Sequence, residues 1–222
     1  MTASASSARS AEIPLILAAI ELFGRDGFAT LSTRALCEHA ATNVSSIKYH
    51  FGGKEELYKA AVLYVVNQLQ PRIEVALATF EQGRDLAGTD PLLQAKLIKQ
   101  LVKNLLQFFL GSEDIPHFMP FVLREFFVPG RYFSIFYDAF PRHLHELFTQ
   151  MVAMVEGSDP EAEETIIRAH SVIGQIMLFH VGRPILFKRL GWQEFTPSRI
   201  ESITHETQLL VLRSLQLADP DD

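Results

Sequence analysis

The spacing of apolar residues is the feature that most restricts what this chain can fold into. Apolar residues recur every three or four positions, as at Ile16, Ala19, Ile20 and Phe23, which is the period of an amphipathic helix. No segment shows the sustained two-residue alternation, rich in β-branched residues, that a half-buried strand would show. The sequence therefore predicts an all-α protein.

Stretches rich in glycine, proline and polar residues interrupt the helical pattern. Such residues end helices, because glycine is too flexible and proline lacks a donor. Three helices before residue 54 and those between the later interruptions make about nine predicted helices. Pro14 is expected in the first turn of the first helix. The later interruptions are `GRDLAGTDP` (83–91), `GSEDIP` (111–116), `VPGR` (128–131), `GSDP` (157–160) and `GWQEFTP` (191–197).

Residues 33–50 have the plan of a helix-turn-helix. Ser32 can cap a short helix, `TRALCEHA`, and after the turn `AATN` Asn43 can cap a second one that reaches His50. Gly52-Gly53 ends that helix, and a long helix begins near Lys54. In this plan the second helix of the pair enters the DNA major groove.

The side chains of the second helix suit a surface that meets DNA. Small side chains at Ser45 and Ser46 let the backbone come close, while Ile47 and Phe51 point back and anchor the helix. Lys54 begins the next helix, whose free N–H groups can hold a phosphate. Polar side chains that can reach phosphates or base edges follow one another at Lys48, Tyr49 and His50.

The charge is unevenly distributed. Residues 1–60 carry equal numbers of basic and acidic side chains, so the net charge of −6 falls entirely in residues 61–222. A protein that is basic over its whole surface is thereby excluded. A neutral head on an acidic body can still bind DNA, and repulsion by the body limits non-specific adhesion.

Composition also limits the compartment. Cys37 is the only cysteine, so no intrachain disulfide can form. We expect no signal peptide in the Ser/Ala-rich start and no membrane span, since no apolar run reaches about 20 residues. The expectation is a soluble cytoplasmic protein with a disordered arm over residues 1–9 and a frayed tail over 218–222.

Residues 16–58 resemble the DNA-binding head of the TetR family of transcriptional regulators. The resemblance covers some 43 residues and, as a set, is specific. It implies a DNA-binding domain over residues 10–53 and an effector-binding, dimerising body over 54–217. The matching positions are Ala18, Ala19, Phe23, Gly27, Phe28, Ser32, Arg34, Tyr49, Phe51, Lys54, Glu55 and Leu57.

Two positions depart from the family pattern. Ala41 stands where the turn usually has glycine, and a left-handed alanine would cost roughly 1–2 kcal/mol. Lys48 stands where the family usually has tyrosine, which favours a phosphate or guanine contact. Carried onto matching positions, the family's DNA contacts are Arg34, Asn43, Ser45, Ser46, Lys48, Tyr49, His50 and Lys54; Asn43 could equally be only a cap.

The C-terminal part resembles the body of the CecR-like subgroup, over residues 121–147 and 168–192. This implies a pocket for a small, largely apolar effector. The density of aromatic rings is also what a plain core would show, and the pocket interpretation rests mostly on the resemblance. The expected pocket residues are Phe108, Phe109, His117, Phe121, Arg124, Phe126, Phe133, Tyr137 and Gln175.

A homodimer is expected because one recognition helix alone binds too weakly, whereas two related by a two-fold axis read paired half-sites. Gly174 would allow close approach of another helix. The apolar stripe on the last helix, which includes Ile203, Thr207 and Leu210, could equally be intrachain core. The expected interface residues are His170, Ile173, Gly174, Met177, Val181, Ile203, Thr207 and Leu210.

No catalytic, cofactor or metal site stands out. His143 and His145 face apart on a helix, and His170 and His180 lack a carboxylate at ligating distance in sequence. We therefore expect a non-enzymatic regulator, a repressor released from a palindromic operator by its effector. The competing class is a helical small-molecule-binding protein or enzyme with no role on DNA.

Overall fold

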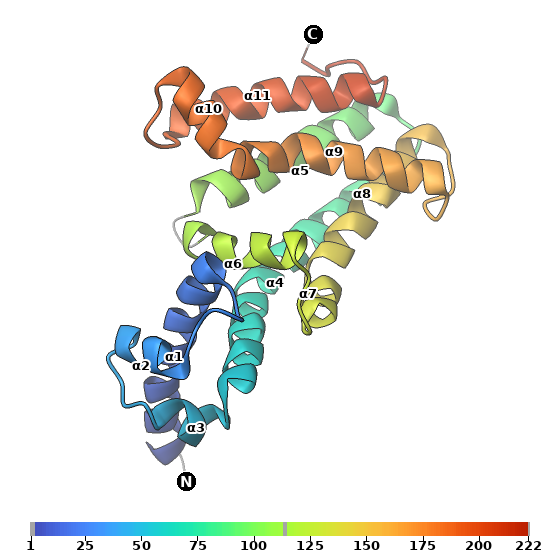
Figure 1. Cartoon of the computed structure of the whole chain (residues 1–222). Coiled ribbons are helices and arrows are strands. Elements are labelled where there is room, and N and C mark those ends of the chain that lie inside the picture. Colours follow the sequence, from blue (N-terminus) through green and yellow to red (C-terminus); the bar gives the residue numbers. More distant parts are fainter. Residues whose placement is uncertain (1–2, 113–114, 222) are drawn as a thin grey trace. The chain divides into compact units, whose positions relative to one another are not determined.

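The computed structural model describes residues 3–112 and 115–221, and the regular structure in these residues is entirely helical (Figure 1). The helices are α1 (Ala3–Asp26), α2 (Thr33–His39), α3 (Ser46–Phe51), α4 (Lys54–Ala87), α5 (Pro91–Gly111), α6 (Ile115–Phe127), α7 (Phe133–Ala139), α8 (Pro141–Glu156), α9 (Glu163–Val181), α10 (Arg183–Leu190) and α11 (Pro197–Ser214). The predicted all-α class is confirmed.

Two of the predicted helices are each divided, so the described residues hold eleven helices instead of about nine. Phe140 separates α7 from α8, since the residue before Pro141 is disfavoured in helical conformation. Gly182 caps both α9 and α10, and Pro184 occupies the first turn of α10. Single breaks of this kind leave the helical period almost undisturbed.

Helix α1 is longer than predicted. Pro14 lies inside it instead of in its first turn, and residues 3–9, expected to form a disordered arm, continue the helix. A proline inside a helix removes one hydrogen bond and can kink the helix without ending it. Residues 1–2 of the expected arm lie outside the described residues.

The chain forms two compact units. The first contains Met1–Pro71 and Pro116–Phe140, and the second contains Arg72–Ile115 and Pro141–Asp222. The first unit thus holds α6 and α7 in addition to the predicted head. Helix α4 runs through the boundary at Pro71, with residues of both units in one continuous helix.

The core of the first unit brings α1, α2 and α3 together beside the beginning of α4 (Figure 1). Phe23, Leu36 and Leu57 are fully buried there, and Ile47 anchors α3 as predicted. Helix α6 lies close to the end of α1: a Cβ atom on Gly24 would be 2.7 Å from the backbone nitrogen of Phe121. Glycine is therefore required at position 24 for this packing.

In the second unit, α11 packs on α5 and α8 packs on α9. The tail beyond α11 is held in place, where the sequence predicted fraying. The ammonium of Lys99 lies 2.6 Å from a carboxylate oxygen of Asp219 and 2.6 Å from one of Asp221. Asp222 lies outside the described residues.

Cys37 is fully buried and free, as expected of a core residue. Among the helices of the described residues, none combines the length and apolarity needed to cross a bilayer.

Candidate functional site

The turn between α2 and α3 is built by local hydrogen bonds. Ser32 caps α2 as predicted, its Oγ accepting from the Ala35 amide at 3.1 Å. At the other end of α2, the Ala41 amide donates to the Glu38 carbonyl and the Thr42 amide donates to that of Cys37. This is the bonding of a Schellman motif.

Ala41 occupies the left-handed position of that motif, with φ of 52°. Glycine is the usual residue there because it has no Cβ to clash with the backbone. The turn therefore keeps the geometry in which glycine is usual, and the chain carries the cost of a left-handed alanine.

Helix α3 begins later than predicted. Asn43 does not cap it: the helix starts at Ser46, and the Asn43 carbonyl accepts from the Ser46 amide at 2.9 Å. Gly52 ends the helix in left-handed conformation, with φ of 84°. Since Asn43 is exposed and is not the cap, its side chain is available to an external partner.

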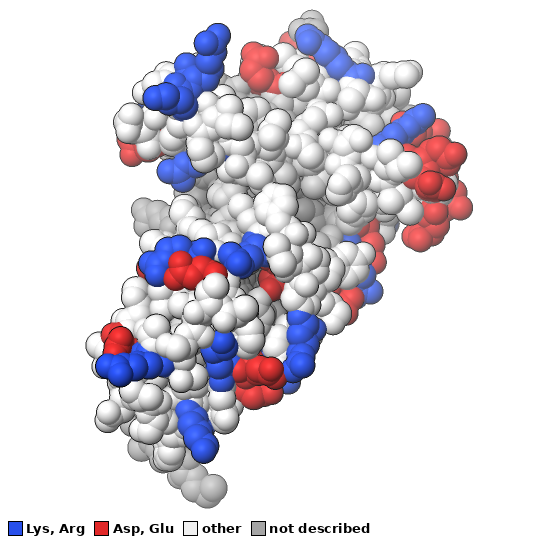
Figure 2. Space-filling view, in the orientation of Figure 1, with Lys and Arg blue, Asp and Glu red and all other residues white. Residues whose placement is uncertain are grey.

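The outer face of α3 presents polar side chains to solvent. Tyr49 is 84% exposed, and Asn43, Ser45 and Lys48 are also exposed, whereas Ser46 is half-buried. The Lys48 side chain has no hydrogen bond or ion pair among the described residues. Figure 2 shows scattered basic side chains over the α1–α3 region and clustered acidic ones at the α8–α9 connection. On the face shown, the basic side chains of this region do not form one continuous patch.

His50 and Arg34 are held by protein partners. His50 is half-buried, its ring lies edge-on to Tyr49 at 4.9 Å, and its Nδ1 is 3.8 Å from a carboxylate oxygen of Glu12. Arg34 is exposed and donates to Glu38 at 2.8 Å. An exposed pair four residues apart on a helix contributes only about 0.3–0.5 kcal/mol, so a phosphate can readily replace Glu38.

Lys54 has a structural role that the sequence did not indicate. Its ammonium donates to the carbonyls of Phe28 and Leu31, at 2.8 and 2.7 Å, and lies 4.2 Å from the centre of the Phe28 ring. An ammonium has three donors, so one is left for a phosphate. Lys54 ties residues 27–31 to the start of α4, and its contact with DNA stays a prediction.

Glu125 is a buried carboxyl that the sequence did not single out as a site. It is 2% exposed, accepts a hydrogen bond from the Tyr58 hydroxyl and another from the Gly130 amide at 3.3 Å. Burial raises its pKa, while the bond from Gly130 acts in the opposite direction. Glu125 thus joins α4 to the segment between α6 and α7 inside the first unit.

The predicted effector residues fall into both compact units. In the first unit, Phe121 is buried, Arg124, Phe126 and Phe133 are half-buried, and His117 and Tyr137 are exposed. The Arg124 guanidinium lies where a Cβ of Gly27 would stand, so it packs on the loop after α1. In the second unit, Phe109 is buried, with Phe108 edge-on to it at 5.0 Å, and Gln175 is half-buried.

Two atoms on α9 are buried without a hydrogen-bond partner among the described residues, namely Oε1 of Gln175 and Nδ1 of His180. Burial lowers the pKa of His180, and a hydrogen bond with the Phe109 backbone opposes the shift. A buried polar atom with no partner costs about 1–3 kcal/mol, so such atoms point to water or a ligand. Of these two residues, only Gln175 was predicted to line the effector pocket.

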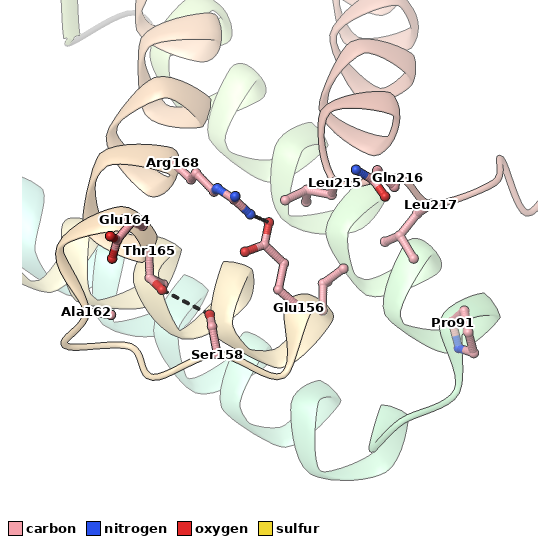
Figure 3. Close-up of a pocket in the computed structure, with 11 residues that line it drawn as sticks. Pro91, Glu156, Ser158, Ala162, Glu164, Thr165, Arg168, Leu215, Gln216 and Leu217 are labelled. Atoms are coloured by element: carbon pink, nitrogen blue, oxygen red, sulfur yellow. Dashed lines mark hydrogen bonds and ion pairs between the residues drawn. The ribbon is translucent and has the colours of Figure 1, made fainter.

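A separate groove of about 630 Å³ lies in the second unit at the α8–α9 connection (Figure 3). Four of its polar side chains form two pairs. Arg168 lies 2.6 Å from a carboxylate oxygen of Glu156, and the Ser158 and Thr165 hydroxyls are 3.0 Å apart. None of the predicted effector residues lines this groove.

The predicted subunit interface is only partly on the surface. His170, Gly174, Val181 and Leu210 are exposed, and Ile173 and Met177 are half-buried. Ile203 and Thr207, at 6% and 1% exposed, are buried within the subunit and offer little surface to a partner, so their place in an interface stays a prediction. Both lie on the face of α11 that packs within the second unit. An apolar stripe in the sequence of one helix does not show whether its own subunit or a second subunit covers that face.

Exposed apolar residues extend the surface of α9 beyond the predicted set. Ile167 and Leu178 are 57% and 67% exposed, and they share a helix face with His170, Gly174 and Val181. Ile185 on α10 is 79% exposed. We call the residues Ile167, His170, Gly174, Leu178 and Val181 the α9 face.

Comparisons with known proteins match both parts of the chain. The family model described as "Bacterial regulatory proteins, tetR family" matches residues 15–61. The model described as "HTH-type transcriptional dual regulator CecR, C-terminal domain" matches residues 95–216. The HTH-type transcriptional dual regulator CecR of Shigella flexneri is 28% identical over 193 residues, which cover 85% of this chain and 84% of the relative.

Solved structures share the fold at low identity. NalD, the secondary repressor of the MexAB-OprM multidrug efflux pump in Pseudomonas aeruginosa, matches with a TM-score of 0.58 and 21% identity over 93% of this chain and 97% of that chain. AibR, solved in complex with isovaleryl coenzyme A and operator DNA, matches with a TM-score of 0.57 and 13% identity over 90% and 97%. At these identities the likeness concerns the fold.

Proposed function

Since the chain belongs to the TetR family of transcriptional regulators and carries the CecR C-terminal domain, we propose that it is a homodimeric repressor of a palindromic operator, released by a small, largely apolar effector. The chain is a DNA-binding regulator of a non-enzymatic family, which sets aside a helical enzyme or binding protein without a role on DNA. The direction of control, the dimer and the effector are the proposed parts.

The observation that carries the DNA-binding surface is the outer face of α3. Tyr49 is 84% exposed and Lys48 has no side-chain partner among the described residues, on the second helix of a helix-turn-helix. A large aromatic ring and a cation left in water by the fold are available to base edges and phosphates. Asn43, Ser45, Ser46, His50 and Arg34 complete the proposed surface.

A mobility-shift titration on DNA from upstream of the gene tests this surface. The logarithm of the binding constant should fall linearly with the logarithm of salt concentration, because phosphate contacts release counterions. Binding to a palindromic segment should exceed binding to a scrambled one of equal length. Equal binding to both would mean that the tested segment contains no operator for this protein.

The proposed dimer uses the α9 face. Exposed apolar side chains along one helix are the surface that a second subunit would bury. Leu178→Glu should convert the dimer to monomer in sedimentation velocity and weaken operator binding with it. Leu86→Glu is the matched control, because Leu86 is 81% exposed on α4 and is not one of the residues of this face. Dissociation by both variants, or by neither, would place the interface elsewhere.

The effector is proposed to bind in the second unit beside α5 and α9. Phe108 and Phe109 supply apolar surface, and the unpartnered Gln175 Oε1 and His180 Nδ1 supply polar groups that would fix its orientation. Gln175→Leu should leave operator affinity unchanged and weaken release by the effector. Release unchanged from that of the wild type in Gln175→Leu would place the effector elsewhere.

Release requires that the effector bind one of two conformations more tightly than the other. Helix α4 is the proposed lever, since Lys54–Ala87 is continuous and includes residues of both units. The sign of control is tested by a reporter gene behind the operator: deletion of the regulator should raise expression. A fall on deletion would make the protein an activator there.

A further inference from the structure

The two ends of α9 carry opposite charges. Residues 156–164, which connect α8 to α9 and begin α9, hold five acidic side chains and no basic one. Residues 183–190, which form α10 directly after α9, hold three basic side chains and no acidic one. Figure 2 shows acidic side chains gathered at the α8–α9 connection and basic side chains over α10. The α9 face thus lies between an acidic end and a basic end.

Most of these charges have no opposite charge beside them within the subunit. Glu156 pairs with Arg168 at 2.6 Å, and the Arg183 guanidinium lies 4.8 Å from the centre of the Phe187 ring. The other six side chains are exposed and form no ion pair among the described residues; they are Asp159, Glu161, Glu163, Glu164, Lys188 and Arg189.

The two ends are too far apart to neutralise each other within one subunit. At a rise of about 1.5 Å per residue, Glu163–Val181 spans roughly 28 Å. Salt screens exposed charges over about 8 Å at physiological ionic strength. Each end is therefore open to a charged partner from outside the subunit.

The apolar stripe of α9 continues into both charged ends. Glu163 precedes Ile167 by four residues and so shares its side of the helix. At the other end, Ile185 is 79% exposed and lines a shallow groove of about 630 Å³ together with Lys188. A Cβ atom on Gly174, midway between the ends, would meet nothing within 4 Å, so a partner helix can approach closely there. A partner that covers the stripe therefore also meets a charged group at each end.

We propose that this surface binds a second copy of the chain in antiparallel orientation, so that the acidic end of each subunit meets the basic end of its partner. This pairing rests on the dimer proposed above and adds its direction. A two-fold axis can relate two α9 helices in parallel or in antiparallel orientation. Parallel helices would set acidic end against acidic end, which repulsion disfavours, whereas antiparallel helices pair each end with its opposite.

A crossing at Gly174 gives the pairing its register. It places Ile167 opposite the partner's Val181, and the first turn of α9 opposite the start of α10 in the second copy. The apolar side chains then meet in the middle and the charges meet at both rims. Each charged contact occurs twice, because the two-fold axis repeats it.

The test reverses the charge of one end at a time in the full-length protein. The α10 reversal carries Lys188→Glu and Arg189→Glu, and the α9 reversal carries Glu163→Lys and Glu164→Lys. Either reversal sets like charges against each other at both rims of a homodimer. In sedimentation equilibrium, each should raise the dimer dissociation constant at least about tenfold in about 50 mM salt and much less in about 1 M salt, which screens the repulsion.

Mixing the two reversals is the decisive measurement. In a heterodimer, the acidic α10 of one subunit meets the basic start of α9 in the other, and the two native ends meet at the opposite rim. Both contacts are again attractive, so native mass spectrometry of an equimolar mixture should show a heterodimer fraction far above that of random pairing. Joining all four changes in one chain should return the dissociation constant to that of the wild type for the same reason.

Lys96→Glu with Lys103→Glu is the matched control. Both lysines are exposed on α5, outside the two ends, and the pair changes the net charge as much as the α10 reversal does. The dissociation constant should stay within about twofold of the wild type. The charges at both ends also favour the dipoles of their own helices, so circular dichroism is used to check that each variant is folded. If the α10 reversal does not fold, Lys188→Gln with Arg189→Gln replaces it, and loss of the attraction should still weaken the dimer.

Dissociation constants of the two reversals equal to that of the control would overturn the proposal, as would a heterodimer fraction equal to that of random pairing. Leu178→Glu separates this failure from failure of the dimer surface itself. If Leu178→Glu dissociates the dimer and the reversals do not, the α9 face stands and the antiparallel charge pairing is wrong. If Leu178→Glu leaves the dimer intact, the face and the pairing are both wrong.

Discussion

The outer face of α3 and the surroundings of Glu125 belong to the same compact unit and treat polar side chains in opposite ways. On α3, Lys48 has no partner among the described residues and Tyr49 is 84% exposed. Around Glu125, a carboxyl that is 2% exposed receives hydrogen bonds from Tyr58 and Gly130. Polar groups that the fold leaves in water are available to an external partner, whereas polar groups that it buries must be paired within the chain.

The largest expected effect is a difference in unfolding free energy between a substitution in the buried core beside Tyr58 and one on the outer face of α3. Phe23→Ala should lower the free energy of unfolding by about 3–5 kcal/mol, because Phe23 is fully buried against Tyr58, with ring centroids 5.0 Å apart. Tyr49→Ala should change it by less than about 0.5 kcal/mol. Urea unfolding followed by circular dichroism measures both. A comparable loss in Tyr49→Ala would mean that α3 packs its outer face.

The converse comparison concerns affinity. Lys48→Ala should weaken operator binding and reduce the salt slope by about one unit, since one phosphate contact is lost. Its unfolding free energy should stay that of the wild type. Lys96→Ala, an exposed lysine on α5, is the control and should retain both affinity and slope. An unchanged slope in Lys48→Ala would remove this residue from the DNA-binding surface.

Ala41→Gly should stabilise the protein by up to about 1 kcal/mol. It relieves roughly 1–2 kcal/mol of left-handed strain. Part of this gain is offset, because glycine raises the conformational entropy of the unfolded chain. The neighbouring Ala40 has φ of −77°, so Ala40→Gly gives no relief and should destabilise. Thermal unfolding of the pair checks the sign. Equal losses in both variants would contradict strain at Ala41.

Glu125→Gln should alter the dependence of stability on pH. The folded-state pKa of Glu125 is raised by burial, so its contribution is fully present at low pH and is lost as pH rises from about 4.5 through the folded value. Tyr58 donates to Oε1 of Glu125 and Gly130 donates to Oε2, so the single oxygen of glutamine can accept only one of the two bonds. The glutamine side chain also stays neutral at every pH. The variant should therefore gain stability relative to the wild type between pH 5 and pH 8, in urea titrations at each pH. A constant difference would mean that Glu125 titrates normally.

The smallest effect should come from the pair that borders α3. Glu38→Gln removes the Arg34 ion pair, and stability should fall by no more than about 0.5 kcal/mol. Operator affinity should rise, because an acidic group beside the DNA-binding surface is lost and Arg34 becomes free. A fall in affinity would show that Glu38 positions Arg34 for its contact.

Much of the first unit was predictable because its signals are local. The Ser32 cap, the inward Ile47 and the break at Gly52 act within a few residues of themselves, and all three occur in the structure. The divisions at Phe140 and Gly182 were missed, since a single break shifts the helical period too little to interrupt the pattern.

The tertiary roles of several side chains were not predictable. Lys54 carries a helix-terminal signal typical of anion binding, yet its ammonium reaches the carbonyls of residues 28 and 31. Ile203 and Thr207 lie on a stripe that fits an interface and are buried instead. A stripe records that a face is covered and contains no information on which partner covers it.

The amino-acid order alone determined the helical class, the helix-turn-helix and the family to which the chain belongs, because period, caps and turns depend on neighbours within about one helical turn. Only the tertiary structure decided that Glu125 meets Tyr58 and that His145 meets His170, 67 and 25 residues apart. Such pairs form when helices pack, and packing depends on the shapes of whole faces that no local pattern specifies.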